Sequence, residues 1–152
     1  MSAPAESAPG KGVVEGACLC GAVRVTLPDP VATTDACHCG ICRKLCGGGP
    51  MLALHAPRGA KPAVEGEDNL SVYASSEWAE RAFCRTCGTP VWYRFVEADF
   101  HSLSAGLFDT ERLTLTREIF IEAKPALYDL AGERPRLTEA EVIAAFEKEA
   151  GA

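Results

Sequence analysis

Short runs in which hydrophobic and polar residues alternate dominate the chain between residues 13 and about 128. In the clearest run Val23, Val25 and Leu27 fall on one face, with the two-residue period of a half-buried strand. Further strand candidates, some with weaker alternation, are residues 51–54, 70–73, 81–84, 91–95, 100–104 and 117–122. Residues 55–69 are rich in Gly, Pro and charge, and are expected to form a loop. Several short strands at this spacing predict an all-β body.

The two ends of the chain have a different pattern. Residues 1–12 are small, polar and rich in Pro and Gly, and they are expected to form a disordered tail. They lack the apolar segment of a secretory signal, so export is not expected. Near the other end, Thr138 and Glu141 have the spacing of a capping box, and an apolar stripe follows. We therefore predict a single domain over residues 13–152 that ends in a helix over about 138–149.

Composition narrows the range of partners. The 152 residues include 15 Lys and Arg against 21 Asp and Glu, which gives a net charge of −6. The length suits one domain with a core of its own. An acidic balance argues against nucleic acid or an anionic membrane as the main partner, because both require clustered positive charge. No run of about 18 apolar residues occurs, so no membrane-spanning helix is expected. The expected location is the cytoplasm.

The chain contains eight cysteines, well above ordinary usage. In the cytosol thiols stay reduced, so metal binding is a better explanation than disulfide bonds, for which 105 pairings would exist. Bridges within such closely spaced pairs would also be strained. Iron–sulfur clusters accept thiolate ligands too, but they usually take four cysteines each and lack the paired motifs described next. Zinc is therefore the favoured ion.

Two cysteine pairs predict a closed structural site. Cys18 and Cys20 lie in a Cys-x-Cys-Gly motif, and Cys84 and Cys87 lie in a Cys-x-x-Cys-Gly motif between strand candidates. The glycine that follows Cys87 permits the sharp turn by which both sulfurs reach one ion, and the first pair is placed on a turn before a strand. Each motif supplies two ligands and structural zinc takes four, so the two pairs are assigned to one ion.

A third motif, Cys-x-Cys-x-x-Cys, places Cys37, Cys39 and Cys42 within six residues. Three protein ligands with one open position is the arrangement of catalytic zinc. Cys46 could close this site if the segment is helical, since it follows Cys42 by one turn. His38 stands between two ligands, and adjacent residues rarely bind one ion, so it is assigned to the surroundings of the site. The sequence alone does not decide between a site with a free coordination position and a site closed by a fourth thiolate.

The order of these motifs resembles the glutathione-dependent formaldehyde-activating enzyme family, also called S-(hydroxymethyl)glutathione synthases. The resemblance covers roughly residues 16–135 and is carried by residues 16–23, 37–44, 83–89 and 106–109, with 119–120, 124–125 and 128–129 toward the C-terminus. In two places the chain departs from the family pattern. Cys46 stands where Ser or Thr is common, and Leu127 stands where Trp is usual.

The resemblance implies a coiled antiparallel β fold and two zinc ions. It implies one structural ion and one catalytic ion, held respectively by Cys18, Cys20, Cys84 and Cys87, and by Cys37, Cys39 and Cys42. The implied activity is that of a carbon–sulfur lyase or synthase that adds the thiol of glutathione to formaldehyde. A thiol that enters the open position would lose its proton and attack the aldehyde carbon.

Two other classes of function remain. The family fold is similar to that of a non-catalytic zinc-binding chaperone of small GTPases, so the chain could be a protein-interaction module with a closed second site. A thiol-based redox or metal-buffering protein would instead release its zinc under mild oxidation.

For several residues near the cysteine motifs, a functional and a purely structural role are both considered. Arg43 and Lys44 could steer an anionic thiol or form a solvated surface pair. The two histidines His55 and His101 could shuttle protons, but packed histidines are the expectation. The larger aromatic residues are expected in the core rather than in a pocket wall: Trp78, Trp92, Tyr93 and Phe120. Asp109 is expected to be a turn residue or a hydrogen-bonding residue.

Overall fold

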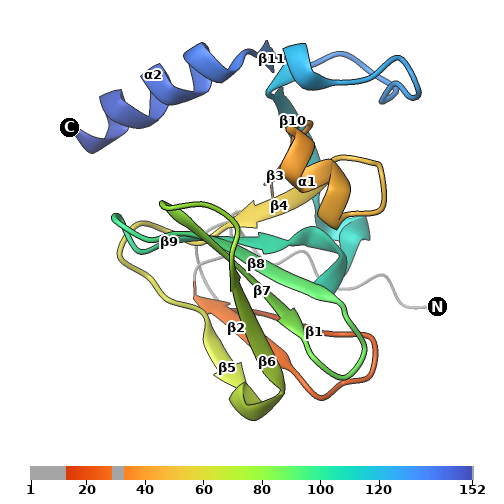
Figure 1. Cartoon of the computed structure of the whole chain (residues 1–152), viewed down its shortest axis with the longest axis vertical. Coiled ribbons are helices and arrows are strands. Elements are labelled where there is room, and N and C mark those ends of the chain that lie inside the picture. Colours follow the sequence, from red (N-terminus) through yellow and green to blue (C-terminus); the bar gives the residue numbers. More distant parts are fainter. Residues whose placement is uncertain (1–12, 29–32, 152) are drawn as a thin grey trace. The chain divides into compact units, whose positions relative to one another are not determined.

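The computed structural model describes residues 13–28 and 33–151, and the chain divides into two compact units (Figure 1). Of the described residues, unit 1 comprises 13–28 and 54–112. Unit 2 comprises 33–53 and 113–151. The predicted tail at residues 1–12 lies outside the described residues. Each unit is assembled from two separate stretches of chain, so each depends on contacts between residues far apart in sequence.

Unit 1 consists of antiparallel strands and short 3-10 turns. One sheet has the order β1-β2-β5, and β6 to β9 pair in succession as a meander. The strands are β1 (Val13–Ala17), β2 (Arg24–Pro28), β5 (Ala63–Glu65), β6 (Leu70–Ala74), β7 (Ala79–Cys84), β8 (Pro90–Phe95) and β9 (Phe100–Ser104). The 3-10 turns are η1 (Glu67–Asn69), η2 (Ala105–Leu107) and η3 (Thr110–Arg112).

The core of unit 1 follows the predicted alternation. Val23, Val25 and Leu27 are buried, and Val91 of β8 and Leu103 of β9 are fully buried. The prediction of a loop over residues 55–69 is wrong in part, because β5 and η1 lie within it. The three residues of β5 add to the edge of β2 through backbone pairing, which their charged and Gly-rich flanks do not reveal.

Unit 2 mixes strands with two helices. Its strand order is β11-β10-β3-β4, in which β4 is antiparallel to β3, while β10 is parallel to both β3 and β11. Its elements are β3 (Thr33–Cys37), α1 (Gly40–Leu45), β4 (Met51–His55, whose last two residues fall in unit 1), β10 (Thr114–Ile119), η4 (Ile121–Ala123), β11 (Arg136–Leu137) and α2 (Glu139–Ala150).

The parallel pairing determines which segments of unit 2 meet. Cys37 at the end of β3 lies opposite Ile119 at the end of β10, which in turn lies opposite Leu137 at the end of β11. Parallel strands end at the same edge of a sheet. The segments that follow β3, β10 and β11 therefore start side by side, and the Cys-x-Cys-x-x-Cys motif begins at this edge.

The mostly-β fold class is confirmed. In unit 1 all strand pairs are antiparallel, as the family resemblance implies. The parallel strand pairs of unit 2 were not expected. At α2 the Thr138 hydroxyl accepts from the Glu141 amide, and the Glu141 carboxylate accepts from the Thr138 amide at 2.7 Å, so the predicted capping box is present. Within the part of the chain that is described, no helix is both long and apolar enough to cross a membrane.

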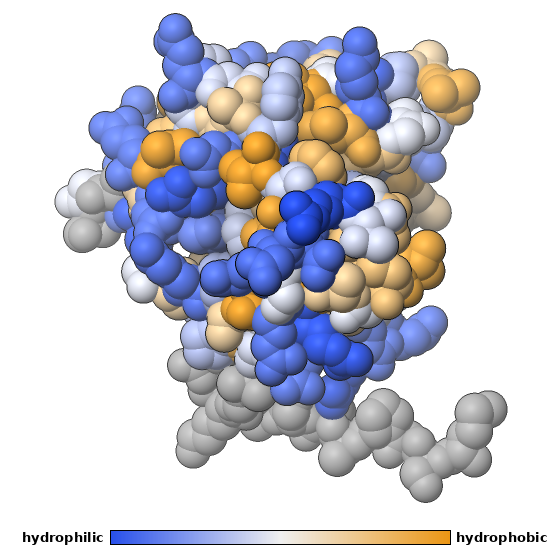
Figure 2. All heavy atoms as spheres, turned by 60° about the horizontal axis from the view of Figure 1, so that its bottom comes forward, coloured by the Kyte–Doolittle hydropathy of each residue, from blue (hydrophilic) through white to orange (hydrophobic). Residues whose placement is uncertain are grey.

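The surface carries hydrophilic and hydrophobic residues side by side. On the face drawn in Figure 2, hydrophilic residues in blue cover much of the area, with hydrophobic residues in orange among them. In unit 1 the exposed hydrophobic residues include Val72, Tyr73 and Trp78. Trp78 is 57% exposed, so the expectation that it belongs to the core is wrong.

Candidate functional site

The first cysteine cluster, which we call the tetrad, comprises Cys18, Cys20, Cys84 and Cys87 in unit 1. It is built by two turns, one between β1 and β2 and the other between β7 and β8. Each turn closes with a glycine amide that donates to the carbonyl of the first cysteine, at 3.0 Å for Gly21 and 2.7 Å for Gly88. Both glycines have φ near +80° (78° and 79°), a conformation that other residues rarely adopt. The predicted turns are thus present.

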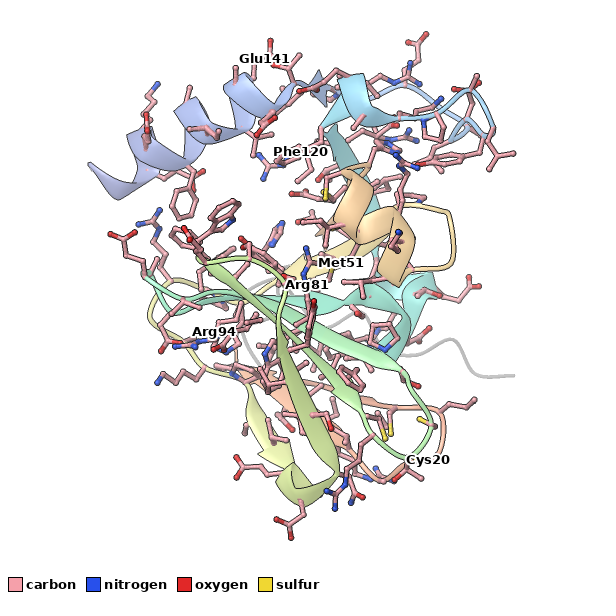
Figure 3. The ribbon with its side chains drawn as sticks, viewed as in Figure 1. Cys20, Met51, Arg81, Arg94, Phe120 and Glu141 are labelled. Atoms are coloured by element: carbon pink, nitrogen blue, oxygen red, sulfur yellow. The ribbon has the colours of Figure 1, made fainter. Side chains whose placement is uncertain are left out.

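The spacing of the tetrad sulfurs suits a tetrahedral ion. All four Sγ atoms lie within 4.8 Å of one another. The Cys18–Cys20 separation is 3.6 Å and the Cys20–Cys84 separation is 3.8 Å. Four sulfurs placed tetrahedrally at the usual Zn–S bond length would be about 3.8 Å apart. Figure 3 shows Cys20 beside other sulfur atoms at this end of unit 1. The residues present therefore fit a zinc ion with four thiolate ligands.

Hydrogen bonds to the tetrad sulfurs disperse negative charge. The Val23 amide donates to Cys18 Sγ at 3.3 Å. The Thr89 hydroxyl lies 3.1 Å from Cys87 Sγ, and its hydrogen bond, with help from backbone amides, lowers the pKa of Cys87 to about 5. The amide of Ala22 lowers the pKa of Cys20, but burial and the three neighbouring thiols raise it to about 11. Four thiols this close cannot all ionise unless a cation is bound, which is the electrostatic reason to place one there.

The second cluster, which we call the trio, comprises Cys37, Cys39 and Cys42 in unit 2. Cys37 ends β3, Cys39 caps the start of α1, and Cys42 lies buried in the first turn of that helix. The Cys42 amide donates to Cys39 Sγ at 3.4 Å. The three Sγ atoms lie within 4.8 Å of one another. Hydrogen bonds to Cys39 and then Cys42 raise the pKa of Cys37, and burial and the charge of these neighbours raise it further.

Cys46 is outside the trio. It caps the C-terminal end of α1, and its amide donates to the Cys42 carbonyl at 2.9 Å. The helix on which closure by Cys46 would depend is present, yet among the described residues the close group of sulfurs in unit 2 contains three members and not Cys46. One turn of helix displaces the side chain of Cys46 along the axis from that of Cys42.

His38 also points away from the sulfurs, although it lies between two of them in sequence. Its side chain is fully buried. Nδ1 lies 2.7 Å from the hydroxyl of Tyr128, and Nε2 lies 2.8 Å from Glu118 Oε1. With both ring nitrogens hydrogen-bonded, His38 is not placed to bind the same ion as the trio.

Glu118 of β10 is the centre of this buried network. It is fully buried and accepts hydrogen bonds from Arg134 at 2.9 Å and Arg136 at 3.1 Å in addition to His38. Burial raises the pKa of Glu118, but the bonds from His38, Arg134 and Arg136 outweigh it and hold the pKa below its usual value. Sequence analysis missed this residue. The strand around it, Thr-Leu-Thr-Arg-Glu-Ile, mixes polar and apolar residues, so its sequence does not indicate a buried carboxylate.

Two cations lie beside the trio. Arg43 Nε donates to the His38 carbonyl at 3.0 Å, whereas Lys44 is exposed. Lys124, after η4, pairs with Asp129 at 2.7 Å and stands 5.4 Å from the centre of the Tyr128 ring. Both Arg43 and Lys124 act on the Tyr128 hydroxyl by lowering its pKa, although burial raises it overall.

The remaining candidates lie elsewhere. Both histidines outside the motif belong to unit 1: His55 Nδ1 lies 2.9 Å from Ser102 Oγ, and His101 is buried against the edge of Trp92. Phe120 follows β10 in a left-handed conformation with φ of 56°, which is rare for a bulky residue (Figure 3). Asp109 accepts from the Glu111 amide at 3.2 Å, so it lies in the predicted turn.

A model of the glutathione-dependent formaldehyde-activating enzymes matches residues 13–123, which include both clusters. The chain belongs to this family. An uncharacterised lyase of Schizosaccharomyces pombe is 33% identical over 136 residues, or 88% of this chain and 97% of the relative. A Halomonas elongata protein, provisionally named a glutathione-dependent formaldehyde-activating enzyme, is 34% identical over 53% of this chain and 55% of its own length. The names of these relatives support a lyase-like enzyme.

The fold has a counterpart among solved structures. A crystal structure of a Rhodobacter sphaeroides protein aligns with a TM-score of 0.52 at 23% identity, over 80% of this chain and 98% of that one. At this level of identity the likeness concerns the fold alone.

Proposed function

We propose that the protein is a zinc-dependent carbon–sulfur lyase that joins glutathione to formaldehyde at the trio and separates them in the reverse reaction. The observation that supports this proposal most directly is the number of sulfur atoms in each cluster: four lie close together in unit 1, and three in unit 2. Four thiolates saturate a structural zinc, whereas three leave a position for a substrate. Family membership supports the choice of thiol and aldehyde.

In this proposal Cys37, Cys39 and Cys42 hold the second ion, and the tetrad holds the first as a structural element. When bound at the trio, zinc would supply a Lewis acid that favours the thiolate form of the substrate thiol. Three thiolates would leave a zinc centre with a net charge of −1, which is poorly suited to generating hydroxide. Three cysteine ligands therefore suit a reaction in which a thiol is the nucleophile better than one in which zinc-bound water is the nucleophile.

The reaction itself is an addition. A bond forms between the thiol sulfur and the aldehyde carbon, the carbonyl π electrons pass to oxygen, and the thiol proton ends on that oxygen. The product is an S-hydroxymethyl thiol. Holding both reactants in one site contributes by proximity. Arg43 and Lys124 place positive charge close to Tyr128 at the same edge, which favours a substrate thiol that carries carboxylates, as glutathione does.

Exchange NMR tests the proposal. With ¹³C-formaldehyde and glutathione, the wild-type protein should speed exchange between formaldehyde hydrate and the hydroxymethyl thiol. Cys39→Ser should lose this acceleration and one metal ion per chain while it keeps its fold, since the tetrad is untouched. Cys46→Ser is the matched control from the same segment and should retain both ions and full activity. Wild-type protein without any acceleration would contradict the proposal.

Metal coordination separates this proposal from a non-catalytic module. X-ray absorption at a fully loaded sample should report an average of three and a half protein sulfurs per ion, from four at the tetrad and three at the trio. In Cys46→Ser the average should stay the same. Four sulfurs at both ions, with a fall in Cys46→Ser, would instead favour a closed and purely structural second site.

A further inference from the structure

A line of hydrogen bonds runs from the half-buried Tyr128 into the interior of unit 2. The Tyr128 hydroxyl lies 2.7 Å from His38 Nδ1, His38 Nε2 lies 2.8 Å from Glu118, and Glu118 is held by Arg134 and Arg136. Tyr128 reaches partly into solvent, His38 and Glu118 are fully buried, and Arg136 beyond Glu118 is exposed again. The buried part fixes where the tyrosine hydroxyl stands.

The backbone of His38 is held as firmly as its ring. Its amide donates to the Ile119 carbonyl at 3.0 Å, and its carbonyl accepts from Arg43 Nε at 3.0 Å. A residue fixed on four sides has little freedom to move its ring. The Tyr128 hydroxyl therefore has a defined position relative to the cysteines on either side of His38.

This position is at the trio. His38 lies between Cys37 and Cys39 in sequence, and the rings of His38 and Tyr128 have centroids 5.6 Å apart. The strained backbone of Phe120 lies at the same edge, directly after the residue that pairs with Cys37. Strain of this kind is typical of functional sites.

The Tyr128 hydroxyl retains hydrogen-bonding capacity for a ligand. A phenol can donate one hydrogen bond and accept others, and His38 Nδ1 occupies one of these positions. Among the described residues no second hydrogen bond to this hydroxyl is found. The oxygen of a hydroxymethyl group can both donate and accept, so it can pair with Tyr128 whichever way the bond to His38 runs.

We propose that Tyr128 contacts the aldehyde-derived oxygen of the substrate, and that His38 and Glu118 are positioning residues that hold its hydroxyl in place. The proposal rests on the proposed function at the trio and adds a residue to it. Tyr128 would bind the one oxygen that distinguishes the hydroxymethyl thiol from the free thiol, so it would affect the aldehyde half of the reaction and leave thiol binding alone.

Two measurements on one variant test the proposal. Tyr128→Phe keeps the ring and removes the hydroxyl. The NMR exchange rate between formaldehyde and its glutathione adduct should fall roughly tenfold, the size of one lost hydrogen bond. The Kd of S-methylglutathione, which has the thioether but no hydroxyl, should stay within about twofold of wild type, as should metal content. Tyr73→Phe, at an exposed tyrosine of unit 1, is the control and should change neither.

Variants of His38 test the positioning role. In His38→Asn the side-chain amide lies near the position of Nδ1 and can still hydrogen-bond to Tyr128. In His38→Gln the amide lies near the position of Nε2 and can hydrogen-bond to Glu118 instead. We expect His38→Asn to retain more exchange activity than His38→Gln at equal metal content. If either variant fails to fold, Tyr128→Phe alone decides.

The outcomes are distinct. An unchanged exchange rate in Tyr128→Phe would overturn the inference while it leaves the proposed function intact. An equal loss of S-methylglutathione binding would overturn it too, because Tyr128 would then shape the site in general. Wild-type protein that neither binds the thioether nor accelerates exchange would overturn the proposed function, and this inference with it.

Discussion

The two cysteine clusters differ less in their sulfurs than in what surrounds them. The tetrad stands at the end of a unit with an apolar core of Val, Leu and Ala, and amides and one threonine hydroxyl contact its sulfurs. The trio stands beside a buried network of ionic groups. A cluster whose sulfurs accept hydrogen bonds from the backbone has the features of a structural site. A cluster beside buried ionic groups, whose desolvation costs free energy of folding, has the features of a catalytic or binding site.

The largest expected effect comes from breaking the tetrad. Cys84→Ser replaces a fully buried cysteine in one of its turns, a predicted ligand of the structural ion. Because the free energy of binding structural zinc contributes directly to folding, we expect a protein that is aggregated or largely unfolded at room temperature. Circular dichroism and size-exclusion chromatography would show this. Cys46→Ser, with all seven other cysteines intact, should melt like wild type; a soluble Cys84→Ser protein with native melting would contradict the assignment.

Breaking the buried network of unit 2 should cost less, but still several kcal/mol. Glu118→Ala leaves Arg134, Arg136 and His38 without their shared acceptor, and removing one partner of a buried ion pair typically costs about 3–5 kcal/mol. Glu118→Gln keeps the shape and part of the hydrogen bonding, so its loss should be smaller. Urea unfolding measures both. Equal loss of stability in the two variants would show that the charge alone, and not shape or hydrogen bonding, accounts for the effect.

The smallest effect concerns the surface network of unit 1. Hydrogen bonds from Lys61 and Arg94 lower the pKa of Asp99 to about 2 in the folded protein, below its ordinary value near 3.9. Asp99 therefore stabilises the fold above about pH 4, and this contribution is lost as the pH falls toward 2. Asp99→Asn should lower Tm slightly at pH 7, and the difference from wild type should shrink in acid. A difference independent of pH would exclude this ion pair as its source.

Sequence reasoning was most successful where the information is local. The turns at Gly21 and Gly88 and the capping box at Thr138 each depend on a few adjacent residues, and the structure contains them. The grouping of Cys18 and Cys20 with Cys84 and Cys87 relied on ligand counting instead of proximity. The structure brings these sulfurs together, while their role as zinc ligands stays a prediction.

The parts that sequence reasoning missed depend on topology. Tyr128 and Glu118 meet His38 across 90 and 80 residues, and only the parallel pairing of β10 with β3 brings them to one edge. Alternation patterns carry no information on strand direction, so this pairing could not be inferred. β5 was missed for a related reason, since three residues at a sheet edge show too little periodicity to detect.

The spacing of the cysteines along the chain also bears on the order in which metal can be acquired. The trio lies within six residues, so a nascent or unfolded chain already carries these three thiols close together and can capture an ion early. The tetrad joins residues more than sixty positions apart and can form only after both of its turns have been synthesised and docked. An ion at the tetrad thus reports that both turns of unit 1 are in place, whereas an ion at the trio requires no such long-range contact.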